Sequence, residues 1–375
     1  MTVTDSTALR RELVDRLTAD GALRSEPWRA AVEAVPRHKF LRDGFFRRFG
    51  DAWQPVPADR EDWLEHCYTD ESLVTQIAGT IVPGDIRGEI LREPTSSSTL
   101  PSLVVQMLED LQVQDGDRVL EIGTGTGTGY STGLLCHRLG DGLVTSVEVD
   151  AEVSRRAGIG LGACGYFPDL VVGDGLAGHP DGAPYDRLVA TCGVREVPHT
   201  WLEQTKPGGM VLATLCGWMH SSELAQLTVG HDGVAHGRFL GRQVSFMLAR
   251  PHLPPPLGIL PDFESGEERS TRVGADVLDD WDARFVAQLA APRTQRLSLT
   301  SADGTRHVLV DVEAGAWAAL ALDREQWTVR QGGPVPLWDA MEDHLLRWQT
   351  DGSPALDRFE IVITPQGQRV TWPTP

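Results

Sequence analysis

The sequence contains little lysine and no clustered cysteine. Only two of its 375 residues are lysine, Lys39 and Lys206, and the other basic residues are arginines. The five cysteines are far apart and form no C-x-x-C pair, which argues against a disulfide framework or a zinc cluster and for a reducing compartment. The eleven histidines include no H-E-x-x-H pattern. We therefore expect a cytoplasmic protein with no bound metal.

Long apolar runs are also missing. The N-terminus, MTVTDSTALRREL, lacks the apolar core of a signal peptide, and no stretch approaches the ~18 apolar residues that a membrane span needs. Acidic residues outnumber basic ones by 53 to 34, which gives a formal net charge of −19. Because a field of that sign repels phosphate groups, we expect no nucleic-acid partner. The lack of an apolar span leads us to expect no membrane partner either.

The composition is that of a globular protein, with 41% hydrophobic and 23% charged residues. The length favours two or three domains. Residues 251–261 hold five prolines and mark the candidate boundary. We predict an N-terminal helical region at 1–95, a central domain at 96–250 and a small α+β accessory domain at 262–375.

The central domain alternates strands with helices. Apolar runs predict strands at 118–122, 144–149, 170–172, 187–191 and 210–215, with a turn at Pro207-Gly208-Gly209. Helical spacing predicts helices at 100–111 and 131–139, after 151 and at 201–204. Such alternation predicts a doubly wound, mainly parallel sheet covered on both faces, the Rossmann-like α/β fold. Beyond residue 262, two hairpins and a helix at 337–348 predict the α+β unit.

The strongest local signal is VLEIGTGTGTGYSTGLL at residues 119–135. An apolar strand ends with Glu121, glycines follow at every second position, and a helix begins. Glycines allow a tight turn and close approach of a ligand. A P-loop is excluded because no G-K-[ST] ends the turn. The carboxylate placed before the glycines suits a cationic, amine-bearing ligand and favours S-adenosylmethionine over NAD.

Two more acids follow at the ends of the next strands. Glu148 lies 25 residues after Gly123, near the ~20 expected for an acid that binds ribose hydroxyls. Asp174 ends the third strand, where an adenine amino group could donate to it. Each acid could instead be a solvated strand end or a turn former. The predicted cofactor-binding residues are Glu121, Gly123, Thr124, Gly125, Gly127, Glu148, Val149, Asp174 and Gly175.

Several short runs together resemble one family. These runs are VPRHKF (35–40), YTDESL (68–73), TLP (99–101), VGDG (172–175), APYD (183–186) and KPGG (206–209). With the glycine motif, they resemble protein-L-isoaspartate O-methyltransferases over residues 9–250. The resemblance implies a class I methyltransferase fold, S-adenosyl-L-methionine as cofactor and methylation of a carboxyl group.

Four longer runs resemble one branch of that family, the methyltransferases of graspetide pathways. They are TDESLVTQ (69–76), PTSSSTLPSLV (94–104), RQGGPVPLWD (330–339) and ITPQGQRVTW (363–372). The branch implies methylation of an Asp side chain in a macrocyclised ribosomal peptide, followed by closure to an aspartimide. Its partners would be the cross-linked precursor peptide and an ATP-grasp ligase, with the C-terminal domain recognising the peptide.

Two alternatives stay open. One is a repair methyltransferase for isoaspartyl residues, against which we count the C-terminal extension of more than a hundred residues. The other is a non-catalytic escort that binds peptides with an inactive methyltransferase fold. The intact acids at 121, 148 and 174 argue against the escort.

The resemblance also indicates site residues. The hydroxyls of Ser97, Ser98 and Thr99 would orient the substrate carboxylate, although this run could equally cap the following helix. The predicted substrate-binding residues are Arg37, His38, Tyr68 and Asp70. Two departures stand out: the glycine motif is two residues longer than usual, and Thr99 replaces the serine of the repair enzymes.

Overall fold

The computed structural model describes residues 6–301 and 304–374, and they divide into two compact units. The first comprises residues up to 192 together with 198–212 and 226–234; the second comprises 193–197, 213–225 and 235 onward. Strands β8 (Tyr185–Val194), β9 (Thr205–Cys216) and β10 (Ser222–Val229) contribute residues to both. This division differs from the three predicted segments, because the N-terminal region packs with the central domain and the proline-rich stretch lies inside the second unit.

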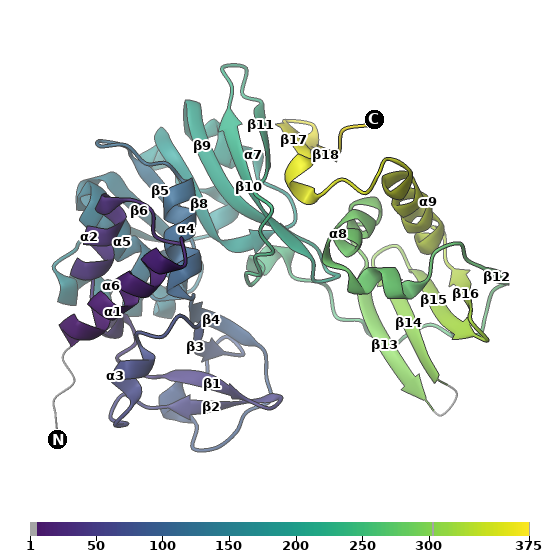
Figure 1. The fold of residues 1–375 in the computed structure, drawn as a ribbon, viewed down its shortest axis with the longest axis horizontal. Coiled ribbons are helices and arrows are strands. Elements are labelled where there is room, and N and C mark those ends of the chain that lie inside the picture. Colours follow the sequence, from purple (N-terminus) through teal and green to yellow (C-terminus); the bar gives the residue numbers. More distant parts are fainter. Residues whose placement is uncertain (1–5, 302–303, 375) are drawn as a thin grey trace. The chain divides into compact units, whose positions relative to one another are not determined.

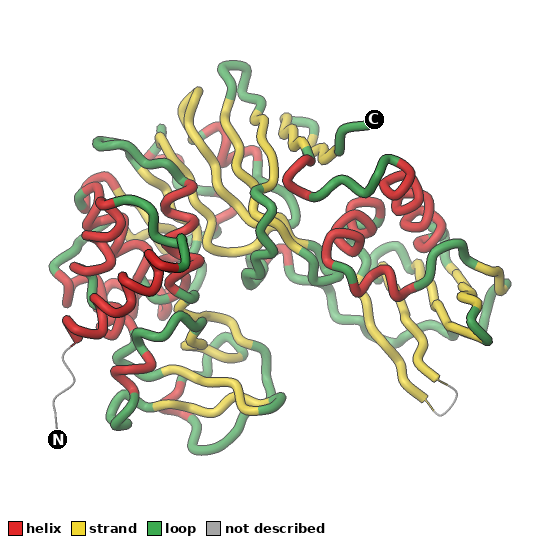
Figure 2. Tube along the Cα trace, viewed as in Figure 1, coloured by secondary structure: helices red, strands yellow, loops and turns green. Residues whose placement is uncertain are grey.

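The first unit is built on a parallel sheet (Figures 1 and 2). Strand β5 (Val119–Ile122) lies between β6 (Val144–Glu148) and β8, parallel to both, and β7 (Asp169–Val172) continues the sheet beside β6. Every residue of β5 and β6 is buried, as is typical of parallel strands covered on both faces. The predicted Rossmann-like α/β fold is confirmed.

The helices of the first unit lie where the apolar spacing predicts them, except α3 (Trp63–His66), which was not predicted. They are α1 (Ser6–Ala19), α2 (Glu26–Ala34), α3 (Trp63–His66), α4 (Pro101–Asp110), α5 (Tyr130–Leu139), α6 (Ala151–Cys164) and α7 (His199–Glu203). Helix α4 begins with Pro101, as its fixed φ favours. The predicted turn at Pro207-Gly208-Gly209 is wrong, because these residues lie within the long strand β9.

A second, antiparallel sheet in the first unit follows the order β2-β1-β3-β4. Its strands are β1 (Phe45–Phe49), β2 (Ala52–Val56), β3 (Leu73–Ile77) and β4 (Pro94–Ser98). Phe46, Val74 and Ile77 form its small core. Strand β4 contains most of the hydroxyl run, so this run extends as a strand instead of capping α4, whose N-cap position is Leu100.

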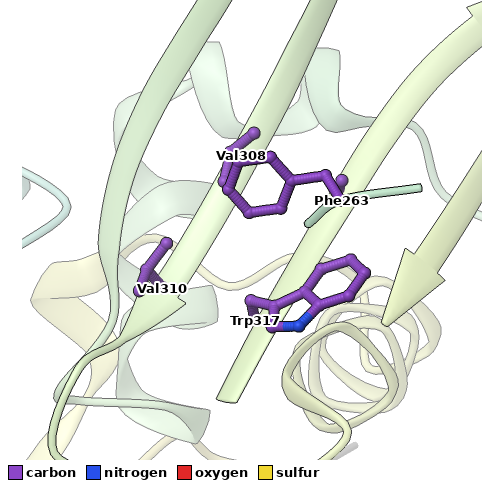
Figure 3. Packing of buried hydrophobic residues seen from close by; sticks show 5 residues of the cluster. Phe263, Val308, Val310 and Trp317 are labelled. Carbon is purple, nitrogen blue, oxygen red and sulfur yellow. The ribbon is translucent and has the colours of Figure 1, made fainter. Parts of the chain in front are cut away.

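The second unit is α+β, as predicted. Its five-stranded antiparallel sheet has the order β12-β16-β15-β14-β13, with strands β12 (Glu268–Ser270), β13 (Gln295–Ser301), β14 (Gly304–Asp311), β15 (Ala316–Asp323) and β16 (Gln326–Gly332). Phe263, Val308, Val310 and Trp317 pack on it (Figure 3), and the Phe263 and Trp317 rings meet edge to face at 5.4 Å between centroids. The sequence predicts a hairpin turn at 302–304 between β13 and β14, and residues 302–303 of it lie outside the described residues.

Two helices and a further hairpin complete the second unit. Helix α8 (Trp281–Ala290) contacts α9 (Leu337–Thr350), which also packs on β15 and β16. The predicted hairpin near residue 366 is confirmed as β17 (Glu360–Thr364) and β18 (Gly367–Thr371), but β17 pairs with β11 (Ala235–Phe239) and not with the five-stranded sheet.

Candidate functional site

The loop between β5 and α5 carries the glycine motif, and each of its four glycines has a positive φ. A Cβ at Gly127 would lie 2.3 Å from Ser96 Oγ, and one at Gly129 would lie 3.2 Å from the Ala157 backbone of α6. Residues Thr124–Gly127 form a 3₁₀ turn, and Gly129 is the N-cap of α5. The longer motif thus adds a turn whose last glycine lets α5 approach α6 closely.

Glu121 is enclosed beneath this loop and has no exposed surface. Its carboxylate accepts hydrogen bonds from the hydroxyls of Ser131 (2.5 Å), Thr132 (2.5 Å) and Ser146 (2.8 Å) and from the backbone N–H of Gly125 (3.1 Å). Burial raises the pKa of Glu121, and these donors oppose the rise. The predicted direct contact with a ligand amine is therefore replaced by a different role: the carboxylate holds the loop in shape.

The carboxyl ends of β6 and β7 carry the other predicted cofactor residues. Glu148 accepts from the backbone N–H of Thr124 (3.2 Å) and of Asp150 (3.0 Å). Its predicted contact with the ribose hydroxyls stays a prediction. The next residue, Val149, is 43% exposed. An acid followed by an exposed apolar side chain suits a ribose joined to a flat base.

Asp174 and Gly175 lie on the same edge of the sheet, after β7. Asp174 is exposed and its Oδ1 accepts from the Leu176 N–H at 3.0 Å, starting a short 3₁₀ turn. A Cβ at Gly175 would lie 2.5 Å from Ile122 Cγ2, so a larger residue would push this turn away from β5. Both observations are compatible with the predicted adenine contact, which stays a prediction.

Strand β4 packs directly on the glycine loop. Ser96 Oγ donates to the Gly127 carbonyl at 3.0 Å, and the Ser97 backbone is close enough that a Cβ on Gly127 would meet it at 3.2 Å. Ser97 is half-exposed, whereas Ser98 and Thr99 are buried. The hydroxyl run and the glycine motif, predicted separately, are thus parts of one structure.

Arg37 explains how the end of this strand is fixed, and it corrects a prediction. The guanidinium is fully buried. Nε donates to Ser98 Oγ, Nη1 to the Cys67 and Thr69 carbonyls, and Nη2 to the Glu71, Ser98 and Thr99 carbonyls, at 2.9–3.3 Å. Because every nitrogen already donates and none reaches the surface, Arg37 is a structural residue and not a substrate contact.

Comparison with known proteins identifies the family. The model for "Protein-L-isoaspartate(D-aspartate) O-methyltransferase" matches residues 8–235. The chain belongs to this family. Two relatives with the name protein-L-isoaspartate O-methyltransferase come from Methanopyrus kandleri (33% identical, covering 60% of this chain and 84% of the relative) and Ignicoccus hospitalis (30% identical, covering 54% and 80%). This protein is therefore an S-adenosyl-L-methionine-dependent methyltransferase.

The fold likeness extends beyond the family match. A solved structure with the same name covers 97% of this chain and 99% of its own, with a TM-score of 0.58 at 22% identity. A C-terminal unit is therefore part of the fold of a protein named for isoaspartate.

The other predicted substrate-binding residues, His38, Tyr68 and Asp70, have different surroundings in the structure. His38 Nδ1 lies 2.7 Å from the hydroxyl of Tyr68, and His38 is partly exposed whereas Tyr68 is buried. Burial lowers the pKa of His38 and raises the pKa of Tyr68 to about 12. Asp70 Oδ1 instead accepts from the Ser102 N–H at 2.8 Å, and Ser72 Oγ from the Leu100 N–H at 3.1 Å. The TDESL run therefore satisfies the open N-terminus of α4.

Several important residues were not predicted. Ser131, Thr132 and Ser146 hold Glu121, and Ser96 joins β4 to the glycine loop. The only sequence signal for the first two is that hydroxyls begin the helix after the glycines. Among residues 6–301 and 304–374, no group of three His, Cys, Asp or Glu side chains is placed to hold a metal, and no helix is long and apolar enough to cross a membrane.

Proposed function

We propose that this methyltransferase esterifies an aspartate-derived carboxylate within a peptide chain. The carrying observation is the packing of β4 on the glycine loop, where Ser96 Oγ donates to the Gly127 carbonyl at 3.0 Å. Ser97 belongs to the same strand and Thr99 follows it, so both lie on the segment that packs on the loop predicted to bind the methyl donor. Hydroxyl donors at that place suit a carboxylate acceptor.

The residues of the chain act mainly by positioning. The sulfonium cofactor supplies an electrophilic methyl group, and a carboxylate is already an anion at neutral pH. No strong base is therefore needed, and alignment of the reactants is the main contribution of the protein. We assign Glu148, Val149 and Asp174 to the cofactor and Ser97 and Thr99 to the carboxylate, with Ser98 and Arg37 fixing the strand end.

The first substrate candidate is an L-isoaspartyl residue. The family model and the relatives from Methanopyrus and Ignicoccus carry that substrate in their names. The solved structure that bears the same name covers the C-terminal unit as well. An isoaspartyl peptide of almost any sequence would then be methylated.

The second candidate is an α-linked Asp in a macrocyclised ribosomal peptide, supplied by an ATP-grasp ligase in the cytoplasm. The specific support is that two of the runs resembling graspetide enzymes, TDESLVTQ and PTSSSTLPSLV, contact each other. They pair as strands β3 and β4, and side chains of the first run accept hydrogen bonds from N–H groups at the start of α4 in the second. A methyl ester there would be attacked by the next amide nitrogen, which forms the imide and releases methanol.

Mass spectrometry on three substrates separates these candidates. Either substrate would gain about 14 Da as the methyl ester and would lose about 18 Da overall if that ester then closes to the imide, and positioning is the catalytic contribution in both cases. The substrate that reacts, and not the mass change alone, therefore separates the candidates. The third substrate is the linear precursor, which lacks preorganisation and should react poorly in the second case.

The outcome is decisive for each candidate. Methylation of the isoaspartyl peptide with none of the cross-linked precursor establishes the first candidate, and the reverse establishes the second. Binding of S-adenosylmethionine without transfer to any of the three would favour the non-catalytic escort and overturn the proposal. Glu148→Ala is the matched variant that should lower turnover on either substrate.

A further inference from the structure

The second unit contains a cavity of about 410 Å³, within the range of small-ligand sites. Its walls come from residues 195–196, residues 215–217, His252, helix α8 with the residues after it, His344 of α9 and strand β18. No residue of the glycine loop or of β4 lines it. The cavity therefore takes no part in the candidate site described above.

Gln288 lines this cavity and has a buried acceptor without a partner among the described residues. Its side chain is 5% exposed, and its Nε2 donates to the Ser221 carbonyl at 2.8 Å, which fixes the orientation of the amide. The other amide atom, Oε1, is buried and has no hydrogen-bond partner among the described residues. A buried acceptor without a partner is costly, and a donor on a bound ligand would satisfy it.

His344 presents an unused donor. Its Nδ1 lies 2.8 Å from Arg347 Nη2, and because a guanidinium only donates, Nδ1 is the acceptor. Burial lowers the pKa of His344 to about 4, so the ring is neutral near pH 7 and carries its proton on Nε2. That Nε2 is buried and has no partner in the described part of the chain.

Arginines add positive charge. The Arg195 guanidinium lies 4.1 Å from the centre of the Trp218 ring, and its Nη2 donates to the Pro292 carbonyl at 3.3 Å. These contacts fix the side chain, yet its buried Nε has no partner within the described residues. Arg369 also lines the cavity, against one carboxylate, Glu196. Two arginines and one glutamate thus line the cavity, in a chain of net charge −19.

We propose that this cavity binds an acidic residue of a peptide. A carboxylate would accept from Arg195 and His344 and pair with Arg369, and the amide N–H of the same residue would donate to Gln288. The proposal goes beyond the proposed function, because it assigns a second binding site. It shares with that function only the expectation of a peptide ligand. A free dicarboxylate offers the same carboxylate but no amide N–H.

Calorimetry on the full chain tests the proposal, with acetyl-Gly-Glu-Gly-amide as probe and no methyl donor present. The neutral acetyl-Gly-Gln-Gly-amide and succinate are the comparison ligands. We expect the Glu peptide to bind best and its binding to weaken at high salt. Arg369→Gln should reduce its affinity about fivefold or more, the loss of one charge-assisted contact. Arg195→Gln should reduce it further.

Arg238→Gln is the control, since Arg238 is an exposed arginine of the same unit that does not line the cavity. Equal binding of the Glu and Gln peptides, equal losses in Arg369→Gln and Arg238→Gln, or no binding at all would overturn the proposal. Succinate binding as tight as the Glu peptide would overturn the peptide assignment. Since binding is measured without methyl transfer, failure here leaves the proposed function intact.

Discussion

In the first unit, Arg37 and Glu121 are enclosed by partners on every side, whereas in the second unit Gln288, His344 and Arg195 line a cavity with buried atoms that have no partner among the described residues. Buried polar groups are costly unless they are paired. A fully paired group therefore holds structure, and an unpaired one marks a place where a ligand can contribute.

The same comparison redistributes the roles within the candidate site. Arg37 and Glu121 attracted functional interpretations because they are charged residues in family-like runs. Their complete pairing makes them the support of that site, and leaves ligand contacts to the more accessible Glu148, Val149, Asp174 and Ser97. The predictions below test this division, beginning with the group that has the most partners.

The largest effect is expected for Arg37→Met. Removing the guanidinium leaves five backbone carbonyls and one hydroxyl without their donor, so the free energy of unfolding should fall by about 3–5 kcal/mol. Chemical denaturation measures this change. Arg48→Met is the control, because the Arg48 side chain is 67% exposed. If Arg37→Met has normal stability but no longer methylates peptides, Arg37 contacts the substrate, as the sequence predicted.

A smaller effect is expected for Glu148→Ala, measured as cofactor affinity. Loss of the ribose acceptor should weaken S-adenosylmethionine binding by about 1.5–3 kcal/mol, the value of a charge-assisted hydrogen bond. Glu152→Ala, on the first turn of α6, removes a carboxylate that pairs only with surface arginines and should leave calorimetric affinity unchanged. Equal affinities in the two variants would mean that the end of β6 does not contact the ribose.

Substitutions of the neighbouring residues Ser98 and Thr99 should have different effects, on stability and on turnover respectively. Ser98→Ala removes the acceptor of Arg37 Nε and should lower the free energy of unfolding by about 1 kcal/mol. Turnover should fall only as far as the fraction of folded protein falls. Thr99→Val keeps shape and removes the hydroxyl, and should lower kcat/KM about tenfold, or about 1.4 kcal/mol, at unchanged cofactor affinity.

Thr99→Ser is the conservative variant and should restore most of the turnover, because it keeps the hydroxyl. If Thr99→Val methylates normally while the double Ser98→Ala, Thr99→Ala variant loses only stability, the run is structural throughout.

Local patterns predicted most of the fold of the first unit. The apolar spacing of α1, α2 and α4 and the strand–glycine–helix order of β5 and α5 depend on neighbours in sequence, and each lies where the spacing placed it. The prediction of a turn at Pro207-Gly208-Gly209 was wrong because β9 continues through these residues, although glycine and proline usually mark turns between elements.

Long-range packing decided what the sequence could not show. Arg37 looks like part of a basic surface island, and only the return of β4 and of residues 67–71 supplies the carbonyls that bury it. The hydroxyl run precedes a helix and so resembles a cap, but its pairing with β3 makes it a strand. The cavity of the second unit joins segments 195–370 and has no local signature.

The smallest effect concerns a second buried carboxylate and compares it with Glu121. Glu223 on β10 is 1% exposed and, within the described part of the chain, accepts two backbone N–H groups, from Leu224 (3.0 Å) and Arg242 (2.5 Å). Burial raises the pKa of Glu223 to about 7, from an ordinary value of 4.5. Glu121, by contrast, has three hydroxyl donors in addition to a backbone N–H.

The sign for Glu223 follows from proton binding. Between pH 4.5 and about 7 the folded state keeps a proton that the unfolded state has released, so stability falls as pH rises through this window. Glu223→Gln cannot ionise and retains an acceptor oxygen. We therefore expect its Tm to equal that of the unmodified protein near pH 4.5 and to exceed it by about 2–4 °C at pH 8. Glu360→Gln, at an exposed position of β17, should show no such divergence. If the difference in Tm between Glu223→Gln and the unmodified protein does not change from pH 4.5 to 8, the pKa of Glu223 is not raised by burial and its carboxylate is stabilised in the folded protein as well as a paired one.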